Sequence, residues 1–117
     1  MSDFVTLKEN TDFRRLYNRG KAIINPALVI YYSKNRAGIC RIGITASKKA
    51  GNAVERNRSR RVIKEAFRNI AKEIEPCFDF VLVARSKTKH LKSTHIENVL
   101  RDALKNEGLF KSEGELK

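Results

Sequence analysis

The chain has 117 residues, enough for one small domain but not for a second hydrophobic core. Hydrophobic residues make up 41% of it, which excludes a wholly disordered chain. Lysine and arginine number 25 against 13 acidic residues, and the net charge of +12 indicates a polyanionic partner, with nucleic acid first and an anionic membrane surface second. A solvated basic surface with no specific partner is the alternative.

The first predicted element is a helix over residues 11–20, capped by Asn10 or Thr11. Its apolar residues fall at i, i+3 and i+4 and form one stripe: Phe13, Leu16 and Tyr17. Gly20 is expected to end this helix in the left-handed conformation.

Three strands are predicted next, because β-branched and aromatic residues replace the helical spacing. They cover residues 21–25, 28–33 and 40–45, with a turn at 35–38. The connections between them are short, so we expect an antiparallel meander.

The second half of the chain predicts two helices around one buried strand. After a loop at residues 47–53, a helix over 54–74 carries apolar residues at helical spacing on one face and stops before Pro76. Residues 78–84 are nearly all apolar, as a strand buried on both faces would be. A last helix begins at Ser93 or Thr94 and ends near residue 106.

This α-β-β-β-α-β-α order predicts an α+β sandwich, with a four-stranded sheet and its helices on one face. We expect a single domain over residues 1–117, ordered from about residue 7 to residue 107, with a flexible tail at 108–117.

Positive charge is concentrated between Lys48 and Lys72, where nine lysines and arginines accompany two glutamates, a net charge of +7 in 25 residues. Five of these residues recur at every fourth position: Arg56, Arg60, Lys64, Arg68 and Lys72. A helix N-terminus favours acidic residues, so cations crowded there sacrifice stability and form a site for phosphate. An ordinary solvated helix face is the alternative, but such faces usually mix signs.

The segment SKKAGNAVERNRSRRVIKEAFR resembles the signature of the bacterial ribonuclease P protein family. That pattern is Ser-Lys-Lys, then Gly-Asn-Ala-Val, then Arg-Asn-Arg followed by paired basic residues. Its matches here are residues 47–49, 51–54, 56–58 and 60–61. The upstream segment DFRRLYNRG resembles the family's first helix, and the resemblance spans roughly residues 7–104.

The resemblance implies that the chain is the protein subunit of the ribonuclease P ribonucleoprotein, an endonuclease of the hydrolase class. The RNA subunit, with bound Mg²⁺, removes the 5′ leader of precursor tRNA, so no catalytic residue and no metal site is expected in this chain. The implied partners are the ribonuclease P RNA and precursor tRNA, in a 1:1 particle with a monomeric protein. The implied fold has a left-handed βαβ crossover, where general rules favour a right-handed one.

The resemblance also implies two sets of binding residues. Contacts to the catalytic RNA are carried over to Lys48, Lys49, Asn52, Arg56, Asn57, Arg58, Arg60, Arg61 and Lys64. Contacts to the single-stranded leader, in a cleft between the first helix and the sheet, are carried over to Phe13, Tyr17, Tyr31 and Ser47. Aromatic faces suit that task because bases stack on them without regard to sequence. Simple core packing is the alternative role for the aromatic residues.

Some positions depart from the family pattern. Leu28 stands where members often have Phe, and Tyr17 where Phe is frequent. Arg60 replaces a frequent Lys, and Lys64 replaces a frequent Arg, which turns a two-pronged grip on phosphate into a point charge.

Three other functions compete with this interpretation. A nuclease acting without RNA would need a general base or clustered carboxylates, but His90 and His95 lie on a lysine-rich turn and at a helix start. The four aspartates are scattered: Asp3, Asp12, Asp79 and Asp102. A structural RNA-binding protein of ribosomal type fits the composition equally well. The specific order of residue types in the motif at 48–61 argues against it. A DNA-binding module is the third alternative, and no helix-turn-helix spacing in the sequence supports it.

The cysteines and apolar runs indicate a cytoplasmic protein without a membrane partner. Residues 1–10 are polar and show no secretory signal, and no apolar run approaches the ~20 residues of a membrane helix. Cys40 and Cys77 belong to no ligand-spaced set, so we expect two reduced thiols.

Overall fold

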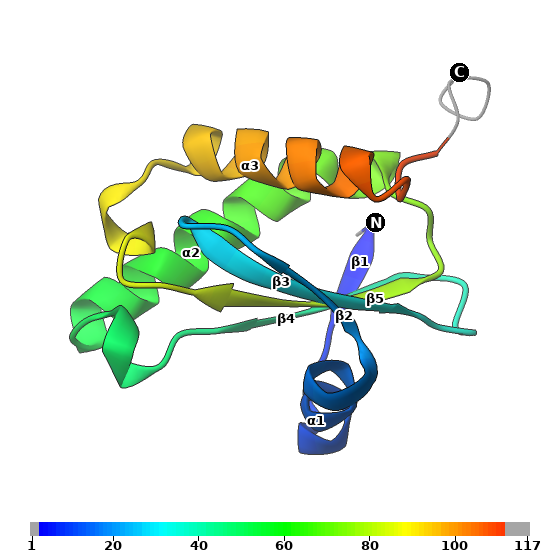
Figure 1. The fold of residues 1–117 in the computed structure, drawn as a ribbon, viewed down its shortest axis with the longest axis horizontal. Coiled ribbons are helices and arrows are strands. Elements are labelled where there is room, and N and C mark those ends of the chain that lie inside the picture. Colours follow the sequence, from blue (N-terminus) through cyan, green and yellow to red (C-terminus); the bar gives the residue numbers. More distant parts are fainter. Residues whose placement is uncertain (1–2, 112–117) are drawn as a thin grey trace.

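The computed structural model describes residues 3–111, which form a mixed α+β fold around one five-stranded sheet (Figure 1). The strands follow the order β1-β4-β5-β3-β2 across the sheet. Their bounds are Phe4–Thr6 for β1, Lys21–Ile24 for β2, Leu28–Lys34 for β3, Cys40–Thr45 for β4 and Phe78–Ala84 for β5. The prediction of a four-stranded sheet is therefore wrong, because β1 adds a fifth strand.

Strand β1 pairs in parallel with β4, and its register places Phe4 opposite Cys40. The Phe4 ring is buried and meets Phe67 edge to face at a centroid distance of 5.3 Å. A three-residue strand shows too little alternation to be recognised as a sequence pattern. Its place in the sheet comes from this long-range packing.

The expected meander is also wrong, because β5 lies between β3 and β4. Strand β5 runs antiparallel to β3 and parallel to β4, while β2 and β3 form the expected antiparallel pair. The centre of the sheet suits β5, since Phe80, Val81 and Leu82 are all fully buried, on both of its faces.

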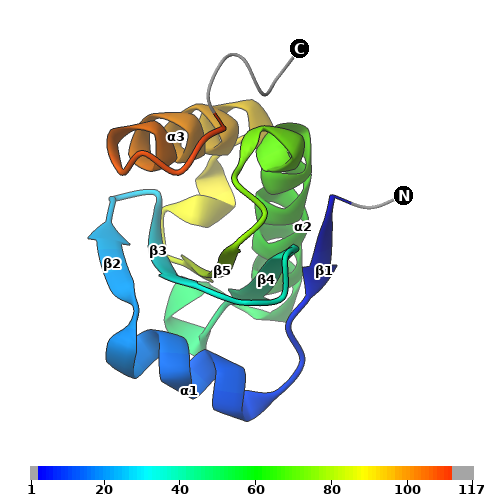
Figure 2. The same cartoon turned by 90° about the vertical axis from the view of Figure 1, so that its right-hand side faces the viewer.

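The helices cover both faces of the sheet, and not the one face expected. Helices α2 (Ala53–Ile70) and α3 (Ser93–Asn106) lie on one face, and α1 (Asn10–Arg19) crosses the other (Figures 1 and 2). The main core lies under α2 and α3, while a second small core of Leu7, Leu16 and Val81 lies under α1. Alternation along the strands makes both cores possible.

The helix ends differ from expectation in two places. Helix α2 ends at Ile70 and continues as a 3₁₀ turn, η2 (Ala71–Glu73). Gly20 follows α1 with extended backbone at φ −74°, not in the left-handed conformation. A Cβ there would lie 2.6 Å from the Leu16 carbonyl oxygen, so a close backbone approach requires this glycine.

Part of the predicted tail belongs to the fold. Leu109 is buried, Phe110 forms a β-bridge with Ile74, and the Lys111 amide donates to the Glu73 carbonyl at 2.8 Å. The rest of that tail, residues 112–117, lies outside the described residues.

Candidate nucleic-acid interface

Most of the predicted basic residues share the side of α2 that faces away from the main core. Asn57, Arg61 and Lys64 are exposed, and Arg56 and Arg60 are half-buried beside them. Arg60 is held in place, since its guanidinium donates to the Asn57 side-chain oxygen at 2.9 Å and to the Ala46 carbonyl at 3.3 Å. The predicted stripe is therefore only partly confirmed: Arg56, Arg60 and Lys64 lie on α2, but Lys72 lies beyond its end in η2 (Ala71–Glu73). Arg68 is on α2 but is paired with Glu65 at 3.1 Å.

The basic loop before α2 contains a 3₁₀ turn, η1 (Lys48–Ala50), whose two lysines are exposed. Asn52, which the resemblance assigned to RNA contact, is the helix cap: its side-chain oxygen accepts from the Glu55 amide at 2.9 Å. Glu55 returns a bond by accepting from the Asn52 amide at 2.8 Å. This bond from the Asn52 backbone lowers the pKa of the Glu55 carboxyl. Positive side chains near the N-terminus of α2 destabilise the helix. This capping box acts in the opposite direction and stabilises its first turn.

Arg58 differs from the other basic residues because its guanidinium is engaged inside the protein. It donates to the carbonyl oxygens of Lys89 at 2.9 Å and Leu91 at 3.3 Å. These bonds fasten α2 to the loop containing the 3₁₀ turn η3 (Thr88–His90). The geometry therefore gives Arg58 a structural part beside any contact with RNA.

That loop is a second basic segment, the lysine-rich turn of the sequence, which was not among the predicted site residues. Residues 85–92 contain four lysines and arginines and no acidic residue. Lys89 lies 3.7 Å from the Glu55 carboxylate, so the segment sits beside the first turn of α2. Its anchor is the buried Thr88, whose hydroxyl bonds the Ala27 carbonyl. The sequence showed its lysine-rich composition, but not its place next to α2.

The predicted leader residues on α1 and β3 come together on the opposite face of the sheet. The Tyr17 and Tyr31 rings meet edge to face at 5.0 Å, and Tyr17 is 43% exposed. The Phe13 ring packs closely against Gly43, where an added Cβ would lie 2.5 Å from its Cε1 and Cζ atoms. Ser47 is exposed just beyond the end of β4. These residues form an aromatic surface with one open ring, that of Tyr17.

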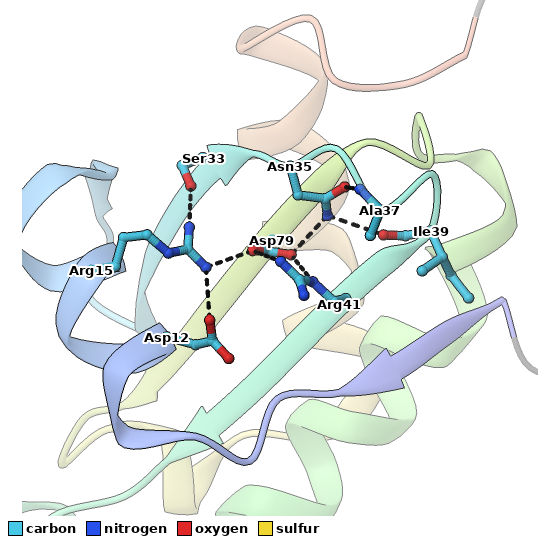
Figure 3. Close-up of polar contacts among 8 residues, drawn as sticks. All are labelled: Asp12, Arg15, Ser33, Asn35, Ala37, Ile39, Arg41 and Asp79. Carbon is cyan, nitrogen blue, oxygen red and sulfur yellow. Dashed lines mark hydrogen bonds and ion pairs between the residues drawn. The ribbon is translucent and has the colours of Figure 1, made fainter.

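A buried carboxylate fastens α1 beneath this surface (Figure 3). Asp79 on β5 is fully buried and accepts from Arg41 on β4 at 2.7 and 2.8 Å. It also accepts from Arg15 on α1 at 2.8 Å and from Asn35 at 2.7 Å. Arg15 reaches on to Asp12 at 3.1 Å. The sequence suggested no role for Asp79, because an aspartate within an apolar strand does not reveal its partners.

The charge state of Asp79 follows from these contacts. Burial alone would raise the pKa of the carboxyl, but the hydrogen bonds from Arg41, Arg15 and Asn35 outweigh it and lower the pKa below its usual value. Asp79 is therefore a carboxylate at neutral pH, engaged with two arginines, and unsuited to act as a proton-transferring group.

Several other predicted features can be located. His90 and His95 are exposed, on η3 and in the first turn of α3. Between residues 3 and 111, no three His, Cys, Asp or Glu side chains gather as a metal site would require, and no helix could cross a membrane. Cys40 is buried and Cys77 half-buried, and both are free thiols, as predicted.

Comparison with known proteins identifies close relatives over nearly the whole chain. A family model described as Ribonuclease P matches residues 1–108. The ribonuclease P protein component of Clostridioides difficile strain 630 is 44% identical over 100 residues, covering 85% of this chain and 88% of the relative. The Staphylococcus aureus RNase P protein, solved at 2.0 Å, superposes with a TM-score of 0.79 at 36% identity, covering 91% of this chain and 97% of that one. The Thermotoga maritima RNase P protein superposes with a TM-score of 0.76 at 28% identity, covering 86% of this chain and 96% of that one.

Proposed function

The chain belongs to the ribonuclease P protein family, and on this premise we propose which of its surfaces bind RNA. It is a subunit of an endoribonuclease and acts in the processing of tRNA 5′ ends, in partnership with ribonuclease P RNA and precursor tRNA. The competing assignment to a structural protein of ribosomal type has no support from these relatives.

The basic surface of α2 and η1 binds the ribonuclease P RNA in this proposal. The observation that carries it is the exposure of Asn57, Arg61 and Lys64 on one side of α2, whose other side is buried. Lys48 and Lys49 are exposed on η1, just before this helix. No ion pair with a described residue occupies Arg61 or Lys64, so their charge is available to phosphate. Arg60 adds a positive charge beside them, held in place by the bonds of its guanidinium to Asn57 and Ala46.

The aromatic surface of Phe13, Tyr17 and Tyr31 binds the 5′ leader in this proposal. Tyr17 presents an open ring for stacking, and its hydroxyl lies 3.5 Å from that of Thr45. Phe13 and Tyr31 pack against the second core, so they support the stacking ring more than they expose their own. Stacking contributes about 1–3 kcal/mol per base and is tolerant of sequence, as a variable leader requires.

The chemistry of cleavage belongs to the RNA subunit in this proposal, and the chain supplies no catalytic residue. The Mg²⁺ ions act at the RNA-based centre, in a cytoplasmic particle with one copy of each subunit. The carboxylates nearest the aromatic surface support this view, because Asp79 and Asp12 are paired with Arg15 and Arg41. The connection from β4 through α2 to the parallel β5 is left-handed in this proposal, as the family resemblance implies.

Reconstitution tests the two binding assignments. The chain is combined with its RNA subunit, and 5′ processing of precursor tRNA is measured at limiting protein. We expect stimulation by the wild type, reduced stimulation by the double variant Arg61→Ala, Lys64→Ala, and wild-type behaviour of Lys105→Ala, an exposed cation on α3. Failure of the wild type to stimulate would refute the role, and equal effects of the two sets of substitutions would refute the α2 surface.

A further inference from the structure

A groove with an apolar lining and a cationic rim runs between α2 and the edge of the sheet. Phe4 and Thr6 of β1 and Ile42 and Ile44 of β4 form its floor. The rim is formed by three residues of α2, namely Arg60, Arg61 and Lys64. Its volume is about 220 Å³. The groove lies on the α2 face of β4, whereas the aromatic surface lies on the α1 face, so the two are separate.

We propose that this groove binds one unstacked nucleotide of the RNA subunit, with the base on the apolar floor and its phosphate on the cationic rim. The inference rests on the proposed function, in which the ribonuclease P RNA is the partner. The groove would add a specific binding pocket to the basic surface of α2 and η1.

The size of the groove fits a single base. An engineered apolar cavity of roughly 150 Å³ holds a benzene ring, so about 220 Å³ holds one flat heterocycle. Drug-sized ligands usually occupy pockets of about 300–1,000 Å³, which makes a larger occupant a poor match.

The chemistry of the lining fits the two parts of a nucleotide. A base buries its faces against apolar or guanidinium surfaces, and the half-buried Ile44 and Arg60 provide one of each. The Thr6 hydroxyl is the uncharged polar side chain of the lining and can bond the edge of the base. Arg61 and Lys64 are exposed at the rim, where a phosphate attached to a seated base would lie.

Charge also decides against other occupants. A hydrophobic peptide or a second copy of this chain, whose net charge is +12, would bring either no charge or more positive charge to a rim of three cations. A phosphate neutralises that rim. A nucleotide is therefore the occupant that satisfies both the apolar floor and the cations.

A pair of filling variants tests the pocket in binding assays with the intact RNA subunit. Ile44→Phe fills the groove without changing its charge, and Ile23→Phe makes the same change in a half-buried residue of β2, at the far edge of the sheet. We expect Ile44→Phe to weaken RNA binding about tenfold, the loss of one stacked base, with the salt dependence of binding unchanged. Ile23→Phe should bind as the wild type does. Equal binding by both variants, with both folded, would overturn the proposal.

A fluorescence experiment keeps the test decisive if Ile44→Phe fails to fold. The chain contains no tryptophan, so Thr6→Trp places a single reporter at the groove and Val5→Trp places one on the opposite face of β1. RNA subunit binding should quench the first by stacking and leave the second nearly unchanged. Equal responses would overturn the proposal, as would a change in Thr6→Trp emission that follows protein concentration without RNA. A wild-type chain that binds no RNA would instead remove the proposed function itself.

Discussion

Replacing Asp79 with asparagine separates the structural role of the buried carboxylate from the RNA-binding surfaces. The wild-type side chain accepts four hydrogen bonds, one oxygen serving Asn35 and Arg41 and the other serving Arg15 and Arg41. Asparagine keeps one acceptor oxygen but presents an NH₂ group to donors, and it removes the negative charge. Arg41 then loses its counter-ion, and Arg15 keeps only its ion pair with Asp12.

The expected cost follows from the burial of Asp79, which is 0% exposed. Removing one partner from a fully buried ion pair costs about 3–5 kcal/mol, because an uncompensated charge is left behind. The charges left here belong to Arg15 and Arg41, whose side chains are 34% and 31% exposed, so we expect a smaller cost of about 2–3 kcal/mol. At roughly 4 °C per kcal/mol for a domain near this size, the melting temperature should fall by about 8–12 °C.

The pH dependence provides a second measure of the same group. A carboxyl whose pKa is lower in the folded than in the unfolded state stabilises the fold above its unfolded pKa of about 3.9, and that contribution is lost as the pH falls through the folded value. The gap in stability between wild type and Asp79→Asn should therefore be full at pH 7 and should narrow in acid, below about pH 4.

Urea unfolding followed by circular dichroism at pH 7 and pH 3 measures both effects, with Asp102→Asn, an exposed residue of α3, as the control. At a temperature where Asp79→Asn is still folded, the loss of its hold on α1 should lower affinity for leader-bearing precursor tRNA more than affinity for the RNA subunit. A variant within about 1 kcal/mol of the wild type at pH 7 would refute the reasoning.

Four further predictions concern other residues of the two surfaces and the core. Arg61→Ala should reduce the slope of RNA affinity against salt by about 0.7–0.9, and an unchanged slope would exclude a phosphate contact. Tyr17→Ala should weaken binding of leader-bearing tRNA more than of mature tRNA, and equal losses would remove the leader from this surface. Arg58→Ala should lower the free energy of unfolding by about 1–3 kcal/mol through its lost bonds to the η3 loop, measured by urea unfolding without RNA. Burial raises the pKa of Cys40 to about 12, so an alkylating reagent at pH 8 should label Cys77 first, and reaction of Cys40 at an equal rate would contradict its burial.

Local signals predicted most of the secondary structure. The helical spacing of Ile63, Phe67 and Ile70 marked α2, and the apolar run of β5 marked a strand buried on both faces. These patterns depend only on neighbours in sequence. They could not reveal that β5 enters between β3 and β4, because strand order is set by which long-range pairing buries the most apolar surface.

The placement of α1 shows the same limit in a different way. Its stripe of Phe13, Leu16 and Tyr17 predicted a buried face but not which face of the sheet would receive it. The answer depends on Val81, which points away from α2, and on Asp79 two residues earlier on the same side of β5. A sheet with two apolar faces requires covering on both, and the apolar character of β5 had already indicated this.

The candidate site was predictable as a set of residues but not as a set of roles. The motif brought Asn52, Arg58 and Arg60 together because they lie close in sequence. The structure gives them different tasks: Asn52 caps α2, Arg58 fastens the η3 loop, and Arg60 is oriented at the groove. A sequence motif records that a residue type is required at a position, and both folding and binding can require it.

Strand β4 connects the two proposed RNA surfaces, and this explains why a small domain can use both faces of its sheet. Its residues alternate, so Gly43 and Thr45 lie under the aromatic surface while Ile42 and Ile44 form the floor of the groove. The chain then continues directly into Ser47 and the lysines of η1, which connect β4 to α2. Because β4 is paired with β1 on one side and β5 on the other, the hydrogen-bonded sheet itself separates the two surfaces. Such an arrangement suits the proposed role, in which one protein contacts the RNA subunit and the leader of precursor tRNA at the same time.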